Sequence, residues 1–169
     1  MKKIILVTFD EEAKTYEGFS QLQKISKSNT FDLKQAMILQ KHADKSKFVV
    51  KDSVDYESNS RVAKGGFIGI IVGILGGPLG VLCGWVIGDA VGASANYIKN
   101  KRTHTIFDSI ANKLDNDELG LLLYADESDE TLLNTMIAEK LNGTIERFDY
   151  EAAKEDVETA KKHLKHNQD

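Results

Sequence analysis

Two patterns of apolar residues alternate along this chain, and they predict strands and helices in a regular order. Short apolar or β-branched runs predict strands at Ile4–Phe9, Gln35–Gln40, Lys47–Val54, Leu119–Ala125 and Thr144–Tyr150. Apolar positions three and four apart predict helices from Asp10 to about Lys27, over Thr105–Leu114, over Asp129–Leu141, and from Ala153 to Leu164. Asn29-Thr30 and Asn142-Gly143 are expected to end two of these helices. Each half of the chain therefore contains a strand–helix–strand unit.

The two halves share a short sequence echo at the point where a strand meets the following helix. Val7–Glu11 and Leu123–Glu127 both end an apolar run with Asp-Glu. The echo predicts a duplicated, ferredoxin-like α+β fold, and a chance match of so few residues is the alternative. The acidic clusters Asp10–Glu12 and Asp126–Glu130 are interpreted as residues that start helices, because acids favour the positive end of a helix. Paired catalytic carboxylates are the alternative interpretation.

Between the two halves lies a segment whose glycines recur at fixed spacing. They are Gly65, Gly69, Gly73 and Gly77, followed by Gly80, Gly84, Gly88 and Gly92. Residues four apart share one face of a helix, so each set predicts a stripe along which another helix can approach closely. The opposite faces are expected to contact lipid or a protein core through Phe67, Ile70, Ile71, Ile74, Leu75, Val81, Leu82, Trp85 and Val86.

This glycine segment is predicted to form a helical hairpin and not a single membrane-crossing helix. Residues 65–88 carry no charge and would span roughly 36 Å as one helix, enough for a crossing. However, the hairpin turn Gly76-Gly77-Pro78 interrupts the glycine register, and proline breaks a helix. A single crossing would also separate the two halves of the sheet. Basic residues flank both ends, which favours the cytoplasmic side for both: Arg61 and Lys64 before the segment, and Lys99, Lys101 and Arg102 after it.

Each predicted arm is roughly 18–24 Å long, which is shorter than the hydrocarbon thickness of about 30 Å. The arms therefore either dip into the membrane or are covered by protein. The protein cover comes from sister subunits in one alternative and from the chain's own core in another. Trp85 and Tyr97 fit an interfacial position. Asp89 is interpreted as an intramembrane ion or proton site, or as a residue at headgroup level within reach of Lys99 and Lys101.

Composition narrows the class of protein. The chain of 169 residues is 41% hydrophobic and 28% charged, which is typical of one globular domain with an insertion. A net charge of −4 and a pI near 5.6 argue against a nucleic-acid-binding protein. The single cysteine, Cys83, excludes a disulfide framework. The run Ile4–Val7 after Lys2-Lys3 is too short for a signal peptide and is expected to be a buried strand.

We predict no catalytic, cofactor-binding or metal site. The glycines lack the G-x-x-x-x-G-K-[ST] pattern of a phosphate-binding loop and the G-x-G-x-x-G pattern of a dinucleotide-binding loop. His163 and His166 are spaced for a metal on a helix, but they lack further ligands and are interpreted as a solvated helix end. Cys83 has no nearby cation to activate it and is interpreted as an inert small apolar residue.

The order of these features resembles a bacterial family of unknown function. The shared features are the first strand, Phe9-Asp10-Glu11, a helix, paired strands, Gly65-Gly66-Phe67-Ile68-Gly69, the Gly-Pro turn and the closing strand–helix–strand unit. Members are commonly described as predicted membrane proteins and look like a ferredoxin-like domain interrupted by a glycine-zipper hairpin. The resemblance covers nearly the whole chain and implies this architecture and membrane association. It provides no active residues, and this sequence departs from the family in its isoleucine-rich hairpin and charged C-terminal helix.

Together these features predict a non-enzymatic protein at the cytoplasmic face of the cell membrane that self-associates through its glycine stripes. Residues 1–58 form the first half of the α/β domain, residues 59–100 the inserted hairpin, and residues 101–169 the second half with a charged C-terminal helix. The expected partners are membrane lipid and a second copy of the chain, with no nucleic acid. A soluble, cytoplasmic homo-oligomer that buries its hairpins is the first alternative. Small-molecule binding by the α/β domain is a lesser one, since it rests on fold analogy.

Overall fold

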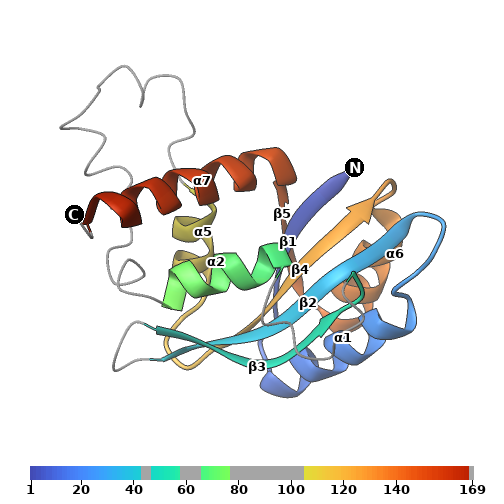
Figure 1. Ribbon diagram of the computed structural model, residues 1–169. Helices are drawn as coiled ribbons and strands as arrows, with labels where there is room; N and C mark the ends of the chain where they lie inside the picture. The colour runs from blue at the N-terminus through green and yellow to red at the C-terminus, as the bar shows by residue number, and fades with distance from the viewer. Residues whose placement is uncertain (43–46, 58–65, 77–104, 168–169) are drawn as a thin grey trace.

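One antiparallel sheet organises the chain (Figure 1). The computed structural model describes residues 1–42, 47–57, 66–76 and 105–167. The strands are β1 (Lys2–Thr8), β2 (Phe31–His42), β3 (Lys47–Asp55), β4 (Leu119–Glu127) and β5 (Thr144–Asp149). Their order in the sheet is β3-β2-β4-β1-β5, and every neighbouring pair is antiparallel. The α+β class and all five predicted strands are therefore confirmed, although β2 begins at Phe31 and not at Gln35.

The two strand–helix–strand units interleave within this sheet. Helix α1 (Glu12–Lys24) connects β1 to β2, and β4 lies between these two strands. Helix α6 (Thr131–Leu133) continues as the π-helical segment η2 (Asn134–Glu139) and connects β4 to β5, with β1 between them. Strand β3, which precedes residues 58–104, and strand β4, which follows them, both pair with β2 and therefore belong to the same sheet.

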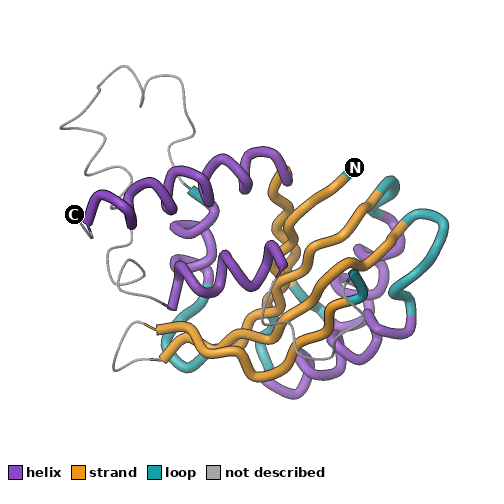
Figure 2. The backbone as a smooth tube through the Cα atoms, viewed as in Figure 1, coloured by secondary structure: helices purple, strands orange, loops and turns teal. Residues whose placement is uncertain are grey.

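Helices cover both faces of the sheet (Figures 1 and 2). Helix α1 and the α6–η2 segment lie on one face, over Ile5 and Val7 of β1. Helices α2 (Gly66–Gly76), α5 (Ile106–Lys113) and α7 (Tyr150–Asn167) lie on the other, over Ile4 and Leu6. Because the central strands are buried on both sides, they appear in the sequence as continuous apolar runs without alternation.

A bulge in β2 determines which of its side chains face each of the two helix layers. The register between β2 and β4 shifts between Leu33 and Gln35. Leu33 belongs to the core under α1, whereas Met37 and Leu39 belong to the core under α2. The extra residue of a bulge reverses the alternation of the strand, so Gln35 shares the α2 face with Met37 and Leu39.

The ends of the helices follow local chemistry, with one difference from the prediction. Thr105 and Asp108 form a capping box at the start of α5. Asn142 has φ of 55°, the left-handed conformation expected of a residue that stops a helix. Helix α1, in contrast, ends at Lys24 and not near Lys27, because the following residues turn to form a bridge between Lys27 and Asp32 beside the start of β2.

Candidate functional site

The inner face of α2 is part of the domain's own core. Five aliphatic side chains of this helix pack over the sheet with β1, β2, β4, α5 and α7: Ile68, Ile71, Val72, Ile74 and Leu75. Ile71, for example, has no exposed surface. From the sequence, lipid, a second subunit and the chain's own core were all open as the surroundings of Ile71, Ile74 and Leu75. The structure buries all three against the chain's own sheet and does not leave them to lipid or a second subunit, because a helix can bury its aliphatic face there.

The outer face of α2 carries two of the glycines of this helix. Gly73 is exposed and Gly69 is half-buried. A Cβ atom built on Gly73 would meet no other described atom within 4 Å. Ile70 lies among these glycines with 37% of its surface exposed, although it was predicted to lie on the opposite face. Gly69, Ile70 and Gly73 therefore form the outer surface of α2, which we call the glycine face. Gly66 is not part of it, because its φ is 79° and a Cβ atom there would overlap the buried Gln35 carboxamide.

The C-terminal end of α2 approaches the neighbouring strand closely. Gly76, predicted as part of the hairpin turn, is the last residue of this helix. A Cβ atom on Gly76 would lie 3.1 Å from the carbonyl oxygen of Phe48 in β3, which is tighter than ordinary van der Waals contact. The absence of a side chain at Gly76 thus lets the helix end rest against the β3 backbone.

The N-terminal end of α2 is held by two buried polar side chains that the sequence analysis did not single out. The Gln35 carboxamide oxygen accepts a hydrogen bond from the Ile68 backbone N–H at 3.2 Å. The Gln35 Nε2 donates to Asp55 Oδ2 at 3.2 Å, and Asp55 Oδ1 accepts from the Glu57 N–H at 2.9 Å. This series of hydrogen bonds provides a partner for the Ile68 N–H, which lies at the start of the helix and has no intrahelical partner. The sequence feature that could have identified this contact is the polar residue Gln35 at a core position of β2.

An aromatic cluster lies beside the first turn of α2. The ring of Phe67 lies 5.0 Å from that of Tyr150 and 6.2 Å from that of Tyr124, and the two tyrosines stack at 5.2 Å. The Lys2 ammonium lies 5.5 Å from the Tyr150 ring centre, within cation–π range. Burial, followed by the nearby Tyr150, raises the pKa of Tyr124 to about 12. Phe67, expected to contact lipid or a protein core, is half-buried in this cluster.

A second polar cluster is centred on the carboxylate of Glu127, whose side chain has no exposed surface. Arg147 donates to both carboxylate oxygens, at 2.6 and 3.0 Å, and Lys3 donates to one at 3.1 Å. Lys3 also pairs with Glu130 at 2.9 Å, and Arg147 donates to the Asn134 carboxamide oxygen at 2.9 Å. These pairs join β1, β4, β5 and the start of η2, so the cluster is best explained as a structural crosslink.

The acidic clusters at the two predicted helix starts have different roles. Asp129 Oδ1 accepts from the Thr131 N–H at 2.9 Å, which agrees with the interpretation as a helix-start residue. Glu127 belongs to the buried ion pairs instead, which corrects that interpretation for this residue. At the start of α1, Glu11 forms no side-chain cap, although Glu12 lies in the first turn.

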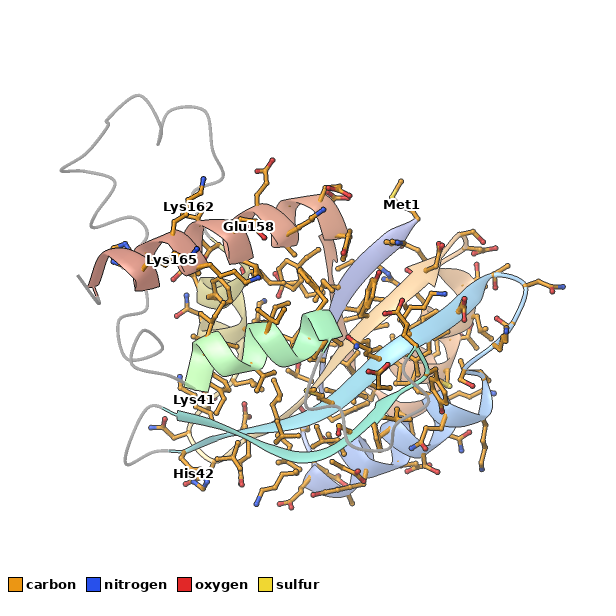
Figure 3. The ribbon with its side chains drawn as sticks, viewed as in Figure 1. Met1, Lys41, His42, Glu158, Lys162 and Lys165 are labelled. Carbon is orange, nitrogen blue, oxygen red and sulfur yellow. The ribbon has the colours of Figure 1, made fainter. Side chains whose placement is uncertain are left out.

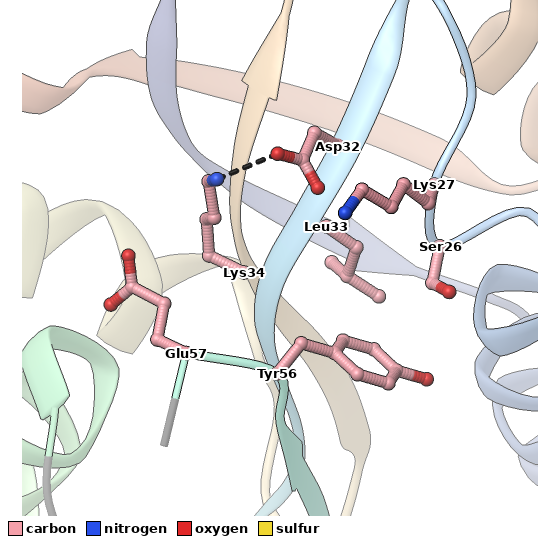
Figure 4. Close-up of a pocket in the computed structure, with 7 residues that line it drawn as sticks. All are labelled: Ser26, Lys27, Asp32, Leu33, Lys34, Tyr56 and Glu57. Atoms are coloured by element: carbon pink, nitrogen blue, oxygen red, sulfur yellow. Dashed lines mark hydrogen bonds and ion pairs between the residues drawn. The ribbon is translucent and has the colours of Figure 1, made fainter. Parts of the chain in front are cut away.

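The surface of the described residues includes a larger and a smaller polar depression. The larger, of about 340 Å³, lies between the start of β2 and the end of β3 (Figure 4), and its lining residues are Ser26, Lys27, Asp32, Leu33, Lys34, Tyr56 and Glu57. Its Lys34 and Asp32 pair with each other at 2.6 Å, which raises the pKa of Lys34. The smaller, of about 130 Å³, is lined by carboxylates including Asp10 and Asp117. Within the described parts of the chain, no three His, Cys, Asp or Glu residues are placed to hold a metal ion.

Several predicted positions lie outside the described residues. They are the glycines Gly65, Gly77, Gly80, Gly84, Gly88 and Gly92, the turn residue Pro78, the apolar residues Val81, Leu82, Trp85 and Val86, and also Cys83, Asp89 and Tyr97. Of the helices that the structure does describe, none has the length and apolar character needed to cross a membrane. Comparison with protein-family models, with curated proteins and with solved structures found no match to this chain.

Proposed function

We propose that this chain is a non-enzymatic protein that associates with the cytoplasmic face of a membrane and with copies of itself through glycine-spaced helices. The observation that carries the proposal is the glycine face of α2. It points away from the core while the aliphatic face of the same helix anchors it to the sheet. A helix fixed in this way presents its backbone to a second helix, and such close approach is how small-residue stripes associate.

The proposal includes a ferredoxin-like domain interrupted by the glycine-rich segment. The order β5-β1-β4-β2, with crossover helices on one face, supports a duplicated strand–helix–strand core. Strand β3 and helices α2 and α5 then fall between the two repeated units in the sequence. Because β2 and β4 pair, the intervening segment leaves one domain and returns to it, as a hairpin does.

In this proposal, residues 77–98 provide the contact with the membrane. Their sequence is apolar, with Asp89 as the only charge. The burial of Ile71 and Leu75 limits the membrane contact of the first arm, since their side chains are used in the domain core. The same burial favours the second candidate function, a soluble homo-oligomer that covers the whole segment with protein.

Fractionation of cells that express the full chain tests the proposal. We expect recovery in the membrane fraction after a high-salt wash, and chemical crosslinking should yield dimers or larger species. Gly73→Leu places a branched side chain on the glycine face and should reduce crosslinking. Ser20→Leu is the matched control, because Ser20 is an exposed small residue on α1, across the sheet from α2.

Three outcomes decide between the candidates. Recovery as a monomer in the soluble fraction contradicts both of them. A large, homogeneous particle purified without detergent supports the soluble oligomer and contradicts the membrane protein. Equal crosslinking of Gly73→Leu, Ser20→Leu and wild type shows that the glycine face is not the association surface.

A further inference from the structure

The last two turns of α7 project beyond the end of α2. The two helices begin together, since the rings of Phe67 and Tyr150 are 5.0 Å apart, and they run in the same direction (Figure 1). Helix α2 has 11 residues and α7 has 18. At 1.5 Å per residue, α7 therefore extends roughly 10 Å past Gly76, the point from which the chain enters the apolar residues 77–98.

Charge is strongly segregated along α7. Its acidic residues all lie within residues 151–158, where Lys154 is the one basic residue, whereas Lys161, Lys162 and Lys165 lie in the projecting part. All three lysines are exposed, and Figure 3 shows Lys162 and Lys165 at the end of the molecule distant from Met1. In the part of the chain that the structure describes, none of the three forms an ion pair.

Helix polarity explains only part of this arrangement. Cations are favourable in the last turn of a helix, where the dipole is negative, and Lys165 fits that reason. Lys161 lies earlier in the helix, where the effect of the dipole has fallen away. The net charge of the whole chain is −4, so an exposed basic end is a local feature against an acidic background.

We propose that Lys161, Lys162 and Lys165 bind the headgroups of anionic phospholipids and thereby orient the domain with this end of α7 toward the bilayer. This inference rests on the proposed membrane association. Three arguments support lipid as the occupant. The lysines are complementary in charge to an anionic surface. They also lie near Gly76, from which the chain continues into the apolar residues 77–98, and basic residues flank that apolar segment in the sequence. The acidic net charge disfavours nucleic acid, the other polyanion that such a cluster fits.

Binding of the full chain to vesicles tests this inference. We expect tighter binding to vesicles of phosphatidylcholine mixed with phosphatidylglycerol than to vesicles of phosphatidylcholine alone, and we expect salt to weaken the preference. The triple variant Lys161→Gln, Lys162→Gln and Lys165→Gln should lose on the order of 100-fold in affinity for the anionic vesicles, from roughly 5-fold for each lysine.

The control variant changes the same number of charges elsewhere. Lys24→Gln, Lys27→Gln and Lys140→Gln neutralise exposed lysines on the α1 and η2 side of the sheet and should bind like wild type. Circular dichroism checks that both triple variants are folded.

The results separate the inference from the proposed function. Equal binding of wild type and the α7 variant to anionic vesicles overturns the headgroup contact but leaves membrane association intact. Equal loss in both triple variants shows only a net-charge effect and also overturns the inference. Failure of wild type to bind either kind of vesicle contradicts the proposed function itself, and binding to duplex DNA without binding to vesicles overturns the choice of lipid.

Discussion

Replacing Ile71 and Gly73 separately by alanine should have opposite effects on stability, because these residues lie on opposite faces of one helix. Ile71 is fully buried, and an Ile→Ala change in a core costs about 2–5 kcal/mol through lost burial and the cavity left behind. Helix α2 is short, with 11 residues, and its end can move inward, so we expect about 3 kcal/mol. For a chain of this length that corresponds to a fall in Tm of about 6–12 °C.

Gly73→Ala should stabilise the domain. The added methyl group meets no described atom within 4 Å, and Ala is favoured over Gly within a helix by about 0.8–1 kcal/mol. Thermal or urea unfolding of dilute protein without lipid, followed by far-ultraviolet circular dichroism, measures both effects. Ile70→Ala is the control for a truncated isoleucine on the exposed face, and it should change stability by less than about 0.5 kcal/mol.

Two results would refute this reasoning. An unchanged Tm for Ile71→Ala would show that the inner face of α2 is not part of the core. A loss for Gly73→Ala as large as that expected for Ile71→Ala would show that the glycine face is already packed within the folded monomer, which would remove it as a surface for association.

Two further predictions concern the polar and aromatic clusters. Arg147→Ala leaves the buried Glu127 carboxylate with Lys3 as its remaining partner and should lower the free energy of unfolding, measured in urea, by roughly 3 kcal/mol. Arg147→Lys keeps the charge, so its stability should lie between that of Arg147→Ala and that of wild type. An unchanged stability of Arg147→Ala would contradict the interpretation of the cluster as a crosslink. The raised pKa of Tyr124, about 12 in the folded chain against about 10 when unfolded, favours folding below pH 10, and this contribution should disappear as the pH rises toward 12. Tyr124→Phe should therefore unfold with a shallower pH dependence in that range, and identical slopes would show that Tyr124 is not buried in its neutral form.

Much of the local structure could be predicted from short-range patterns. The apolar run Ile4–Val7 is a buried strand, the spacing of Ala153, Val157 and Ala160 gives a buried stripe on α7, and Asn142 ends a helix. Each of these depends on residues within one or two turns of each other, for which the chain's own geometry is sufficient.

The surface of α2 and the polar clusters could be predicted only in part. Glycine spacing indicated a helix with one face free of side chains, whereas in α2 Gly69 and Gly73 share their face with the exposed side chain of Ile70. Gln35 and Asp55 were missed because the reach of Gln35 to Ile68 depends on a bulge in β2 that reverses its side-chain alternation. Glu127 was misassigned because its partners, Lys3 and Arg147, are distant in sequence and meet it only after the sheet has formed.

The sequence by itself determined that α2 would have an aliphatic face and a glycine face, since helical periodicity fixes which residues share a side. Only the tertiary structure decided what covers each of them. Apolar side chains leave water equally well for lipid, for a sister subunit or for the chain's own sheet, so hydrophobicity cannot distinguish among these destinations. The pairing of β2 with β4 brings the sheet beneath α2, and this long-range contact assigns Ile71 and Leu75 to the core while leaving Gly73 at the surface.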